Sequence, residues 1–429
     1  MQPLLLFVTL MSPLAVFFNS ALNIDTSLVD DVALLIALFF LLVSGKFSRL
    51  TIAYIPIAAF SVTILFSALV NQTPATSILL QIRSYMLPMV LYFATCYFLA
   101  STRFHERFIK TFLSFSLLLS LVGLAEAATS MHFINKLNMF GEVSGDAFRI
   151  HSLIGHPADY GYYIIFAIAI ALLKLQKNSG PQKTSRAALI VLISILFLNL
   201  TLTVSKGPVL VLAISALALS TLVSSRQRNK TIFYTFIFLT LSAVFALGAW
   251  QERIDKFISG EVMMVDEVTI DEAGRVGFYR QAATVIFDNP LLGVGPGQFG
   301  GWVATSYNSP AHEKYGINTF GISSIDVFYP HLIGELGLFG LLSYLSIFCT
   351  IIYKFSKRLK ISTANKDSTA SFYSTAAIWS TLIILLCGFH TMINETFPHM
   401  ILYWIIIGVA ETKTNNLEKI SRPMSPQNP

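Results

Sequence analysis

The sequence has few charged residues. Asp, Glu, Lys and Arg make up 12% of its 429 residues, whereas 54% are hydrophobic and the mean hydropathy is +0.66. Soluble domains carry about 25% charged residues. This shortage excludes a soluble globular domain and predicts an all-α, polytopic membrane protein. No basic run is interleaved with aromatic residues, which excludes a nucleic-acid-binding surface.

Cysteine is scarce as well. Cys96, Cys349 and Cys387 all lie in apolar stretches and have no metal-ligand spacing or evident disulfide partner. Buried packing is the usual role of such residues. The histidines show no metal-ligand spacing either, and we predict no metal site and no cofactor.

Long apolar runs are what the sequence does have. We predict about twelve membrane-spanning helices, of which 31–44 and 396–411 are shorter than the roughly 20 residues that a span needs. The first run lacks a basic leading region and a clean small-residue cleavage site, so we interpret it as a retained helix. The predicted runs are 3–22, 31–44, 50–70, 85–101, 107–126, 158–176, 187–204, 207–225, 231–250, 326–354, 372–393 and 396–411.

Positive charge predicts the orientation, because cytoplasmic loops are enriched in Lys and Arg. If the N-terminus is cytoplasmic, most of the 29 Lys and Arg residues fall inside and most of the 23 acidic residues fall outside. Both termini are then cytoplasmic. The net charge of +6 mainly reflects this topology.

The predicted connections are unequal in length. Two outer segments are long, about 127–157 and 251–325. Long connections of this kind are usually functional. We therefore divide the chain into N-terminal transmembrane helices (1–250), a large extracytoplasmic loop with an amphipathic helix (251–325), C-terminal transmembrane helices (326–411) and a cytoplasmic tail (412–429).

The amphipathic helix and a glycine-rich stretch stand together in the large loop. In "RVGFYRQAATVIFDNP", the apolar residues Val276, Tyr279, Ala283, Ile286 and Phe287 recur at helical spacing. This predicts a short helix on the outer membrane face that ends before the Asn-Pro pair. "LLGVGPGQFG" follows and contains a GxGxxG match. A dinucleotide loop needs a preceding strand, so we predict a tight turn or a backbone anion site instead.

Four segments carry a resemblance to a known family. "QIRSYMLPMVLYF" (81–93), "RIHSLIGHPADYGYY" (149–163), "LTVSKGPVLVL" (202–212) and "DNPLLGVGPGQF" followed by "ELGLFGLLSYL" occur in the order found in the O-antigen polymerase and ligase family. The resemblance implies a GT-C-like membrane glycosyltransferase of the bacterial inner membrane. Such enzymes transfer sugar chains from polyprenyl-diphosphate carriers such as undecaprenyl diphosphate.

Two positions depart from the family pattern. Ligases typically carry a His-Asn element nine residues before the Glu that opens the late helix, and here that position is Asp326. This favours a polymerase, and it leaves open whether His331 takes over the histidine role. Lys206 stands where arginine is usual, which keeps the charge but loses the bidentate fork.

The chemistry implied by the resemblance requires cations for the diphosphate and a base for the acceptor hydroxyl. Arginine suits the first task because its planar donors match phosphate oxygens, although an interfacial anchor that reaches for lipid headgroups is the alternative role. The predicted catalytic residues are Asp326, His331 and Glu335, with His151 and Asp159 as further candidates. The predicted substrate- and diphosphate-binding residues are Arg83, Arg149, His156, Lys206, Arg275, Arg280, Gly295 and Gly297.

We expect a polymerase of lipid-linked repeat units for O-antigen or exopolysaccharide, acting by a single inverting, metal-independent displacement. The expected partners are the polyprenyl-diphosphate-linked oligosaccharide, membrane lipids, a chain-length regulator and a flippase. The alternatives are a ligase that transfers glycan to lipid A-core and, in a different class, a flippase or other transporter. Twelve-helix transporters usually show two related halves, and no such repeat is evident in the sequence.

Overall fold

The computed structural model describes residues 1–22, 27–44, 51–98, 102–129, 148–177, 183–223, 275–317 and 327–415. Every regular element in these ranges is a helix. The predicted run 231–250, the acidic patch "GEVMMVDEVTIDEAG" and Asp326 lie outside the described residues. Every other predicted run contains a helix, which agrees with an all-α polytopic membrane protein.

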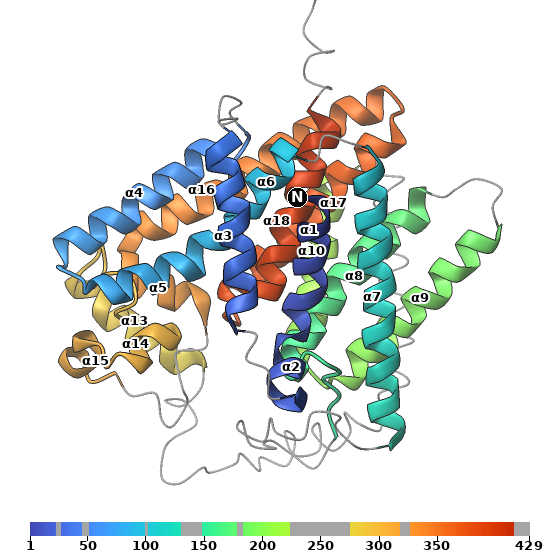
Figure 1. Cartoon of the computed structure of the whole chain (residues 1–429). Coiled ribbons are helices and arrows are strands. Elements are labelled where there is room, and N and C mark those ends of the chain that lie inside the picture. Colours follow the sequence, from blue (N-terminus) through green and yellow to red (C-terminus); the bar gives the residue numbers. More distant parts are fainter. Residues whose placement is uncertain are drawn as a thin grey trace, which may run out of the picture.

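The helices form one bundle (Figure 1). Its first half contains α1 (Gln2–Met11), η1 (Ser12–Leu14), α2 (Ala15–Leu22), α3 (Ser27–Ser44), α4 (Tyr54–Val70), α5 (Ala75–Met86), η2 (Leu87–Met89), α6 (Val90–Phe98), α7 (Thr102–Thr129), α8 (Pro157–Lys177), α9 (Lys183–Leu202) and α10 (Lys206–Leu222).

Its second half contains α13 (Arg275–Asp288), α14 (Gly301–Ser306), α15 (Pro310–Tyr315), α16 (Phe328–Ala364), α17 (Ser368–Cys387), η4 (Ile393–Glu395) and α18 (Phe397–Thr414). Helices α13, α14 and α15 lie at the lower end of the bundle in Figure 1, and α18 ends at the upper end.

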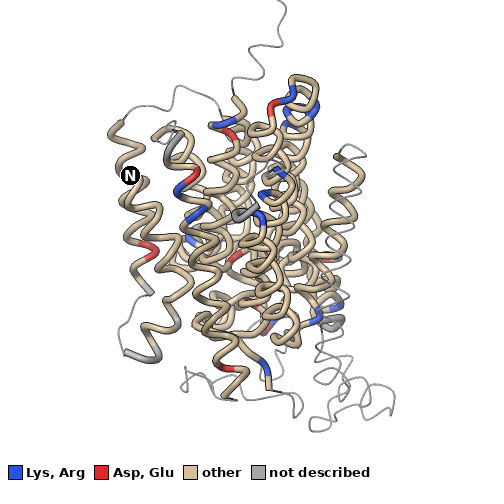
Figure 2. The backbone as a smooth tube through the Cα atoms, turned by 90° about the vertical axis from the view of Figure 1, so that its right-hand side faces the viewer, with Lys and Arg blue, Asp and Glu red and all other residues tan. Residues whose placement is uncertain are grey.

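Five described helices are long and apolar enough to cross a membrane: Ala75–Phe98, Phe104–Thr129, Pro157–Lys177, Phe328–Ala364 and Ser368–Cys387. Helices Gln2–Leu14, Tyr54–Val70, Arg186–Leu202 and Lys206–Leu222 are apolar but shorter. In Figure 2, most of every helix is free of charged residues. The number of twelve spans stays a prediction.

The core of the bundle lies around α8, α17 and α18. Every residue of α8 from Tyr160 to Leu173 is buried, and Trp379 of α17 and Trp404 of α18 are fully enclosed. Helices that are apolar all round are expected inside a bundle. By contrast, α3 and α4 expose large apolar residues such as Phe39, Val43 and Leu69, as helices in contact with lipid do.

Helix α13 confirms the predicted amphipathic helix in extent, and it ends at Asp288, before Asn289-Pro290. The face that packs on the protein is a second one, distinct from the apolar face predicted to meet the membrane. Phe278, Ala282 and Val285 are buried, whereas Tyr279 is 40% and Phe287 is 86% exposed. Since α13 packs on α16 and α15, the protein-facing stripe is selected by these partners and not by apolar periodicity alone.

Helix α16 is interrupted at Gly337, whose φ of 62° and ψ of −160° are not helical. The glycine-rich stretch after α13 repairs the break. The amides of Val294 and Gly295 donate to the carbonyl oxygens of Gly334 (3.0 Å) and Glu335 (2.9 Å), and those of Leu338 and Phe339 donate to Pro290 (2.9 Å) and Leu291 (3.1 Å). The amides of Leu338 and Phe339 and the carbonyls of Gly334 and Glu335, which would pair with each other in a continuous helix, all bind the loop instead. These four hydrogen bonds fix the loop against α16.

Candidate active site

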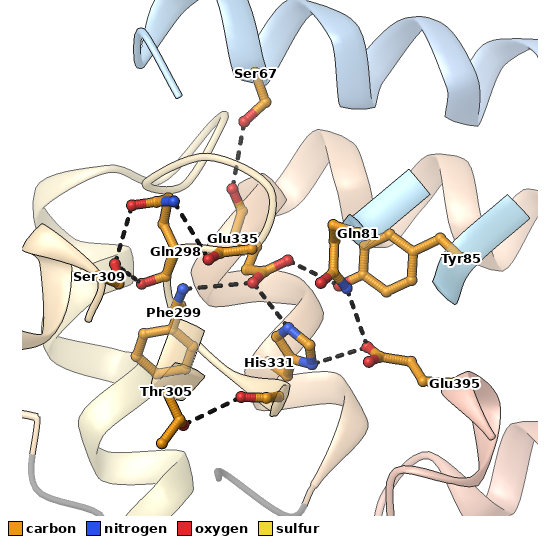
Figure 3. A network of polar contacts seen from close by, with 12 residues as sticks. Ser67, Gln81, Tyr85, Gln298, Phe299, Thr305, Ser309, His331, Glu335 and Glu395 are labelled. Carbon is orange, nitrogen blue, oxygen red and sulfur yellow. Dashed lines mark hydrogen bonds and ion pairs between the residues drawn. The ribbon is translucent and has the colours of Figure 1, made fainter. Parts of the chain in front are cut away.

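A buried carboxylate–imidazole–carboxylate cluster lies beside the break in α16 (Figure 3). His331 Nε2 is 2.9 Å from Glu335 Oε1, and His331 Nδ1 is 2.9 Å from Glu395 Oε1. The spacing of His331 and Glu335 on one helix turn confirms the predicted shared face. Because each ring nitrogen is within ion-pair distance of a carboxylate oxygen, an imidazolium ring at this position pairs with both acids, and pairing of this kind compensates buried charges.

Further donors surround Glu335. Tyr85 Oη donates to Glu335 Oε2 (3.1 Å), and the Phe299 amide approaches Oε1 at 3.4 Å. The side chain of Glu335 is fully enclosed, as is that of His331. The glycine loop contributes by close packing: a Cβ on Gly300 would lie 2.7 Å from the His331 ring, and one on Gly293 would meet the Glu335 backbone.

Glu395 is the third member of the cluster and the one that the sequence prediction missed. It lies at the end of η4, in the connection between α17 and α18 (residues 388–396, the α17–α18 connection). Its Oε1 forms an ion pair with His331 Nδ1 and accepts a hydrogen bond from Gln81 Nε2 of α5 at 3.4 Å. Burial raises the pKa of Glu395 above its ordinary value. The side chain is nevertheless 12% exposed, unlike those of the other two members.

A second group of predicted residues meets where α10 begins. Arg149 Nε donates to the Thr203 carbonyl (3.0 Å), and Arg149 Nη2 donates to Ser205 Oγ (2.8 Å). Ser205 is the N-cap of α10, and the exposed Lys206 follows it. The structure therefore brings Arg149 and Lys206 together, although they are far apart in the sequence.

The segment that carries Arg149 is held by Glu126, a buried acid of α7 that the sequence prediction also missed. Glu126 Oε2 accepts from the backbone amides of His151 (3.1 Å) and Ser152 (2.7 Å). Ser152 Oγ in turn donates to the Leu119 carbonyl (2.7 Å). His151 is itself buried, and burial lowers its pKa below the ordinary value of 6.5.

The α17–α18 connection touches the elements that carry the other family-like segments. Its Phe389 carbonyl accepts from Tyr279 Oη of α13 (3.0 Å), and His390 Nδ1 lies 2.9 Å from Tyr162 Oη of α8. A Cβ on Gly207 would meet the His390 ring. The connection thus lies between the α13 segment, the α8 and α10 N-termini, and the buried cluster.

The remaining predicted residues belong neither to the buried cluster nor to the group at the start of α10. Arg83 is paired with Asp31 at 2.7 Å and lies over the Phe397 ring, 4.7 Å from its centre. His156 is more than half exposed and lies 3.6 Å from Asp159. Arg280 is exposed on α13. The side chain of Arg275 and the whole of Asp326 are outside the described residues.

The two predicted glycines have positive φ, 104° at Gly295 and 71° at Gly297. A Cβ on Gly295 would meet Thr73 Oγ1, and one on Gly297 would lie 2.9 Å from Val303. Because the Gly295 amide already donates to Glu335, both glycines have an evident packing role. Binding of a ligand by this backbone stays a prediction.

One weak feature of the sequence could have identified Glu126 and Glu395 as candidates. An ionisable residue next to apolar segments is costly and therefore a functional candidate. Each of these acids sits at the end of an apolar run, in "LAEAAT" and "MINETF". Nothing in the sequence says that Glu395 meets a histidine 64 positions earlier, because that contact arises from the packing of α16 on α17.

Among the described ranges, no group of three or more His, Cys, Asp or Glu residues is arranged to hold a metal ion. In the buried cluster, His331 Nε2 faces Glu335 and His331 Nδ1 faces Glu395, so the three side chains do not converge on one point.

Comparison with known proteins identifies the segment that carries the family signature. Residues 187–345 match the family model described as O-antigen ligase. This confirms the resemblance over α9, α10, α13–α15 and the first half of α16, and it supports a membrane enzyme of the O-antigen ligase and polymerase type. No curated protein matches the chain significantly. Arg83, Arg149, Glu126 and Glu395 lie outside the matched segment.

Proposed function

We propose that this protein is a membrane glycosyltransferase that joins polyprenyl-diphosphate-linked oligosaccharide repeat units at the outer face of a bacterial inner membrane. The match of residues 187–345 supports an enzyme acting on lipid-linked oligosaccharides. The observation that carries the proposal is the α17–α18 connection, which contacts both the cationic start of α10 and the buried acid–imidazole cluster.

In this proposal the cations bind the diphosphate. Lys206 is exposed, and Arg149 lies beside it on Ser205. Their charges stabilise the leaving diphosphate as negative charge develops on it. Arg280, on the helix joined to the connection through Tyr279, adds a third positive group. Arg83, Arg275 and His156 are assigned to the same ligand by resemblance alone.

The reaction is a single displacement. The acceptor sugar hydroxyl attacks the anomeric carbon of the carrier-linked chain, the bond from that carbon to the diphosphate oxygen breaks, and the electron pair leaves with the diphosphate. The configuration at the carbon is inverted. A base must take the hydroxyl proton within hydrogen-bond reach, and the predicted set is Asp326, His331 and Glu335.

Polymerase is favoured over ligase because Asp326 occupies the position of the ligase histidine. A ligase remains the second candidate, since the matching family model carries that description. Both reactions share the donor and differ in the acceptor, which is a second lipid-linked repeat for the polymerase and lipid A-core for the ligase.

The test uses purified protein with a short polyprenyl-diphosphate-linked repeat unit, with and without EDTA. We expect a ladder of longer lipid-linked products that survives EDTA and is strongly reduced in Arg149→Ala and Arg280→Ala. A control variant, Lys314→Ala, removes an exposed cation of the outer segment and keeps the ladder.

Other outcomes are equally informative. Transfer only after addition of lipid A-core establishes the ligase. Movement of the lipid-linked unit across liposomes without elongation establishes a transporter and refutes the enzyme. Loss of the ladder in EDTA refutes the metal-independent mechanism.

A further inference from the structure

The three members of the buried cluster are not equally accessible. His331 and Glu335 have side-chain exposures of 0%, whereas Glu395 has 12%. The oxygens of Glu335 also have partners: they accept from Tyr85 and the Phe299 amide, and Oε1 forms an ion pair with His331. A group that is fully enclosed cannot touch a sugar hydroxyl, which leaves Glu395 as the member that can.

The two oxygens of Glu395 have different surroundings. Oε1 is held by His331 Nδ1 (2.9 Å) and Gln81 Nε2 (3.4 Å). Within the described part of the chain, Oε2 accepts no hydrogen bond. Its neighbour is Gly301, where an added Cβ would lie 3.4 Å from Oε2 and 2.8 Å from His331 Cε1. One oxygen is therefore anchored while the other is left beside a residue without a side chain.

Glu395 also lies close to the predicted donor-binding residues. Phe397, two residues on, packs under Arg83. Thr396 Oγ1 is 2.8 Å from His399 Nδ1, and His399 Nε2 is 3.0 Å from the Asp159 carbonyl in the first turn of α8. The residues that follow Glu395 thus contact Arg83 of α5 directly and the first turn of α8 through His399.

We propose that Glu395 is the general base for the acceptor and that His331 is a positioning residue which holds its Oε1 so that Oε2 faces the acceptor hydroxyl. This proposal rests on the proposed function. As the acceptor oxygen bonds to the anomeric carbon, its proton passes to Glu395 Oε2, and the electron pair of the breaking carbon–oxygen bond leaves with the diphosphate.

The environment of Glu395 suits that role. Burial raises the pKa of Glu395, and a base is most effective when its pKa lies near the working pH. The groups that face the carboxylate are His331 and Glu335 from α16 and Gln81 and Tyr85 from α5. A proton gained by Glu395 removes its negative charge, and the contacts of Oε1 with His331 and Gln81 keep the side chain in place.

The experiment compares Glu395→Gln and Glu395→Asp with wild type in steady-state elongation of the lipid-linked repeat. Glutamine keeps an acceptor for His331 but cannot take a proton. We expect kcat to fall by about 10²- to 10⁴-fold in Glu395→Gln, with KM for the donor within about twofold. Glu395→Asp recovers part of kcat, and the acidic limb of the pH–kcat profile disappears only in the glutamine variant.

The control is Glu313→Gln, which removes an exposed acid of α15 in the same outer region. Its kcat should equal that of wild type. Thermal unfolding of all variants in detergent shows whether the loss has a structural origin. Unchanged kcat in Glu395→Gln refutes the proposal, as does a loss that follows a lowered melting temperature or a raised KM.

The experiment distinguishes failure of the proposed function from failure of the role proposed for Glu395. If wild type forms no lengthened or transferred product, the proposed function fails first. If wild type is active and Glu395→Gln matches it, only the role of Glu395 fails, and the base must be sought elsewhere, beginning with Asp326.

Discussion

Gly337 is the residue on which the geometry of the site depends most directly. Its φ of 62° and ψ of −160° lie in a region that is essentially restricted to glycine. A Cβ there would meet the backbone of Leu291. The same break frees the carbonyl of Glu335 to bind the glycine loop, so one missing side chain couples α16 to the segment before α14.

We expect Gly337→Ala to be strongly destabilising. Backbone strain of this kind costs about 1–3 kcal/mol, and the clash with Leu291 adds to it because backbone cannot move aside cheaply. Thermal unfolding in detergent measures the loss. The matched control is Gly316→Ala, which also has positive φ, 57°, but has nothing within 4 Å of the added Cβ. Equal losses in both variants would contradict the packing argument.

His151 gives a prediction for pH dependence at the same scale. Burial lowers its pKa in the folded protein below 6.5, so the unfolded chain binds this proton first as the pH falls. The free energy of unfolding therefore decreases as the pH drops below about 6.5 and does not change for this reason above it.

The comparison is between wild type and His151→Gln. Melting temperatures at pH 8 give the cost of the substitution itself. Between pH 6.5 and 5.5 wild type should lose more stability than the variant, because only wild type carries the buried imidazole. Parallel curves would show that His151 contributes nothing to acid sensitivity.

Contacts between residues were predictable only where the sequence distance is short. His331 and Glu335 are four apart, and helical geometry alone placed them on one face. The pairs His331–Glu395 and Arg149–Ser205 could not be predicted, since each joins segments that meet only through helix packing. Local periodicity contains no information on such partners.

At the scale of elements, the segment that precedes α8 is held in place by hydrogen bonds to its neighbours. The carboxylate of Glu126 accepts two of its amides, and the Ile150 amide donates to the Leu202 carbonyl at 3.2 Å. Arg149 then extends to Thr203 and Ser205. The acid of α7 therefore determines where the guanidinium of Arg149 lies.

We expect Glu126→Ala to weaken donor binding. The substitution removes the single oxygen, Oε2, that accepts both amides, and hydrogen bonds to a charged group contribute about 1.5–3 kcal/mol. KM for the lipid-linked donor should rise by about 10-fold or more, with a smaller change in kcat. A lowered kcat at constant KM would mean that the segment acts in the chemical step.

Helix α13 shows which properties of an element the sequence determines. Its start, its end before Asn289-Pro290 and its amphipathic character agree with the prediction. The buried stripe of Phe278, Ala282 and Val285 is a further face that the prediction did not include. Since Tyr279 and Phe287 are apolar and yet exposed, a helix between protein and lipid has two apolar faces, and hydropathy cannot distinguish them.

For the whole molecule, composition predicted the class and the apolar runs predicted the helices. The arrangement follows from burial: α8, α17 and α18 occupy the centre, and α3 and α4 expose apolar residues at the periphery (Figure 1). What the sequence could not predict is that α5 and α6 form one candidate span, Ala75–Phe98, interrupted by η2 at Pro88. Arg83 therefore lies within that span, paired with Asp31, rather than at its entrance.

The distribution of Lys and Arg predicts how the whole molecule is oriented in the membrane. The turn between α16 and α17 lies at the end of the bundle opposite α13–α15 in Figure 1. The last turns of α16 and this turn together carry Lys354, Lys357, Arg358, Lys360 and Lys366 with a single acid, Asp367. Positive loops stay on the cytoplasmic side, so we predict that this turn is cytoplasmic and that α14 lies on the outer side of the membrane.

Single cysteines test this orientation in a background where Cys96, Cys349 and Cys387 are replaced by alanine. Ser306→Cys on α14 and Ala364→Cys at the end of α16 are both at exposed positions. A membrane-impermeant maleimide should label Ser306→Cys in intact spheroplasts and Ala364→Cys only after permeabilisation. The reverse pattern would place the acid–imidazole cluster on the cytoplasmic side, away from lipid-linked repeats at the outer face, and the proposed function would then fail on topology alone.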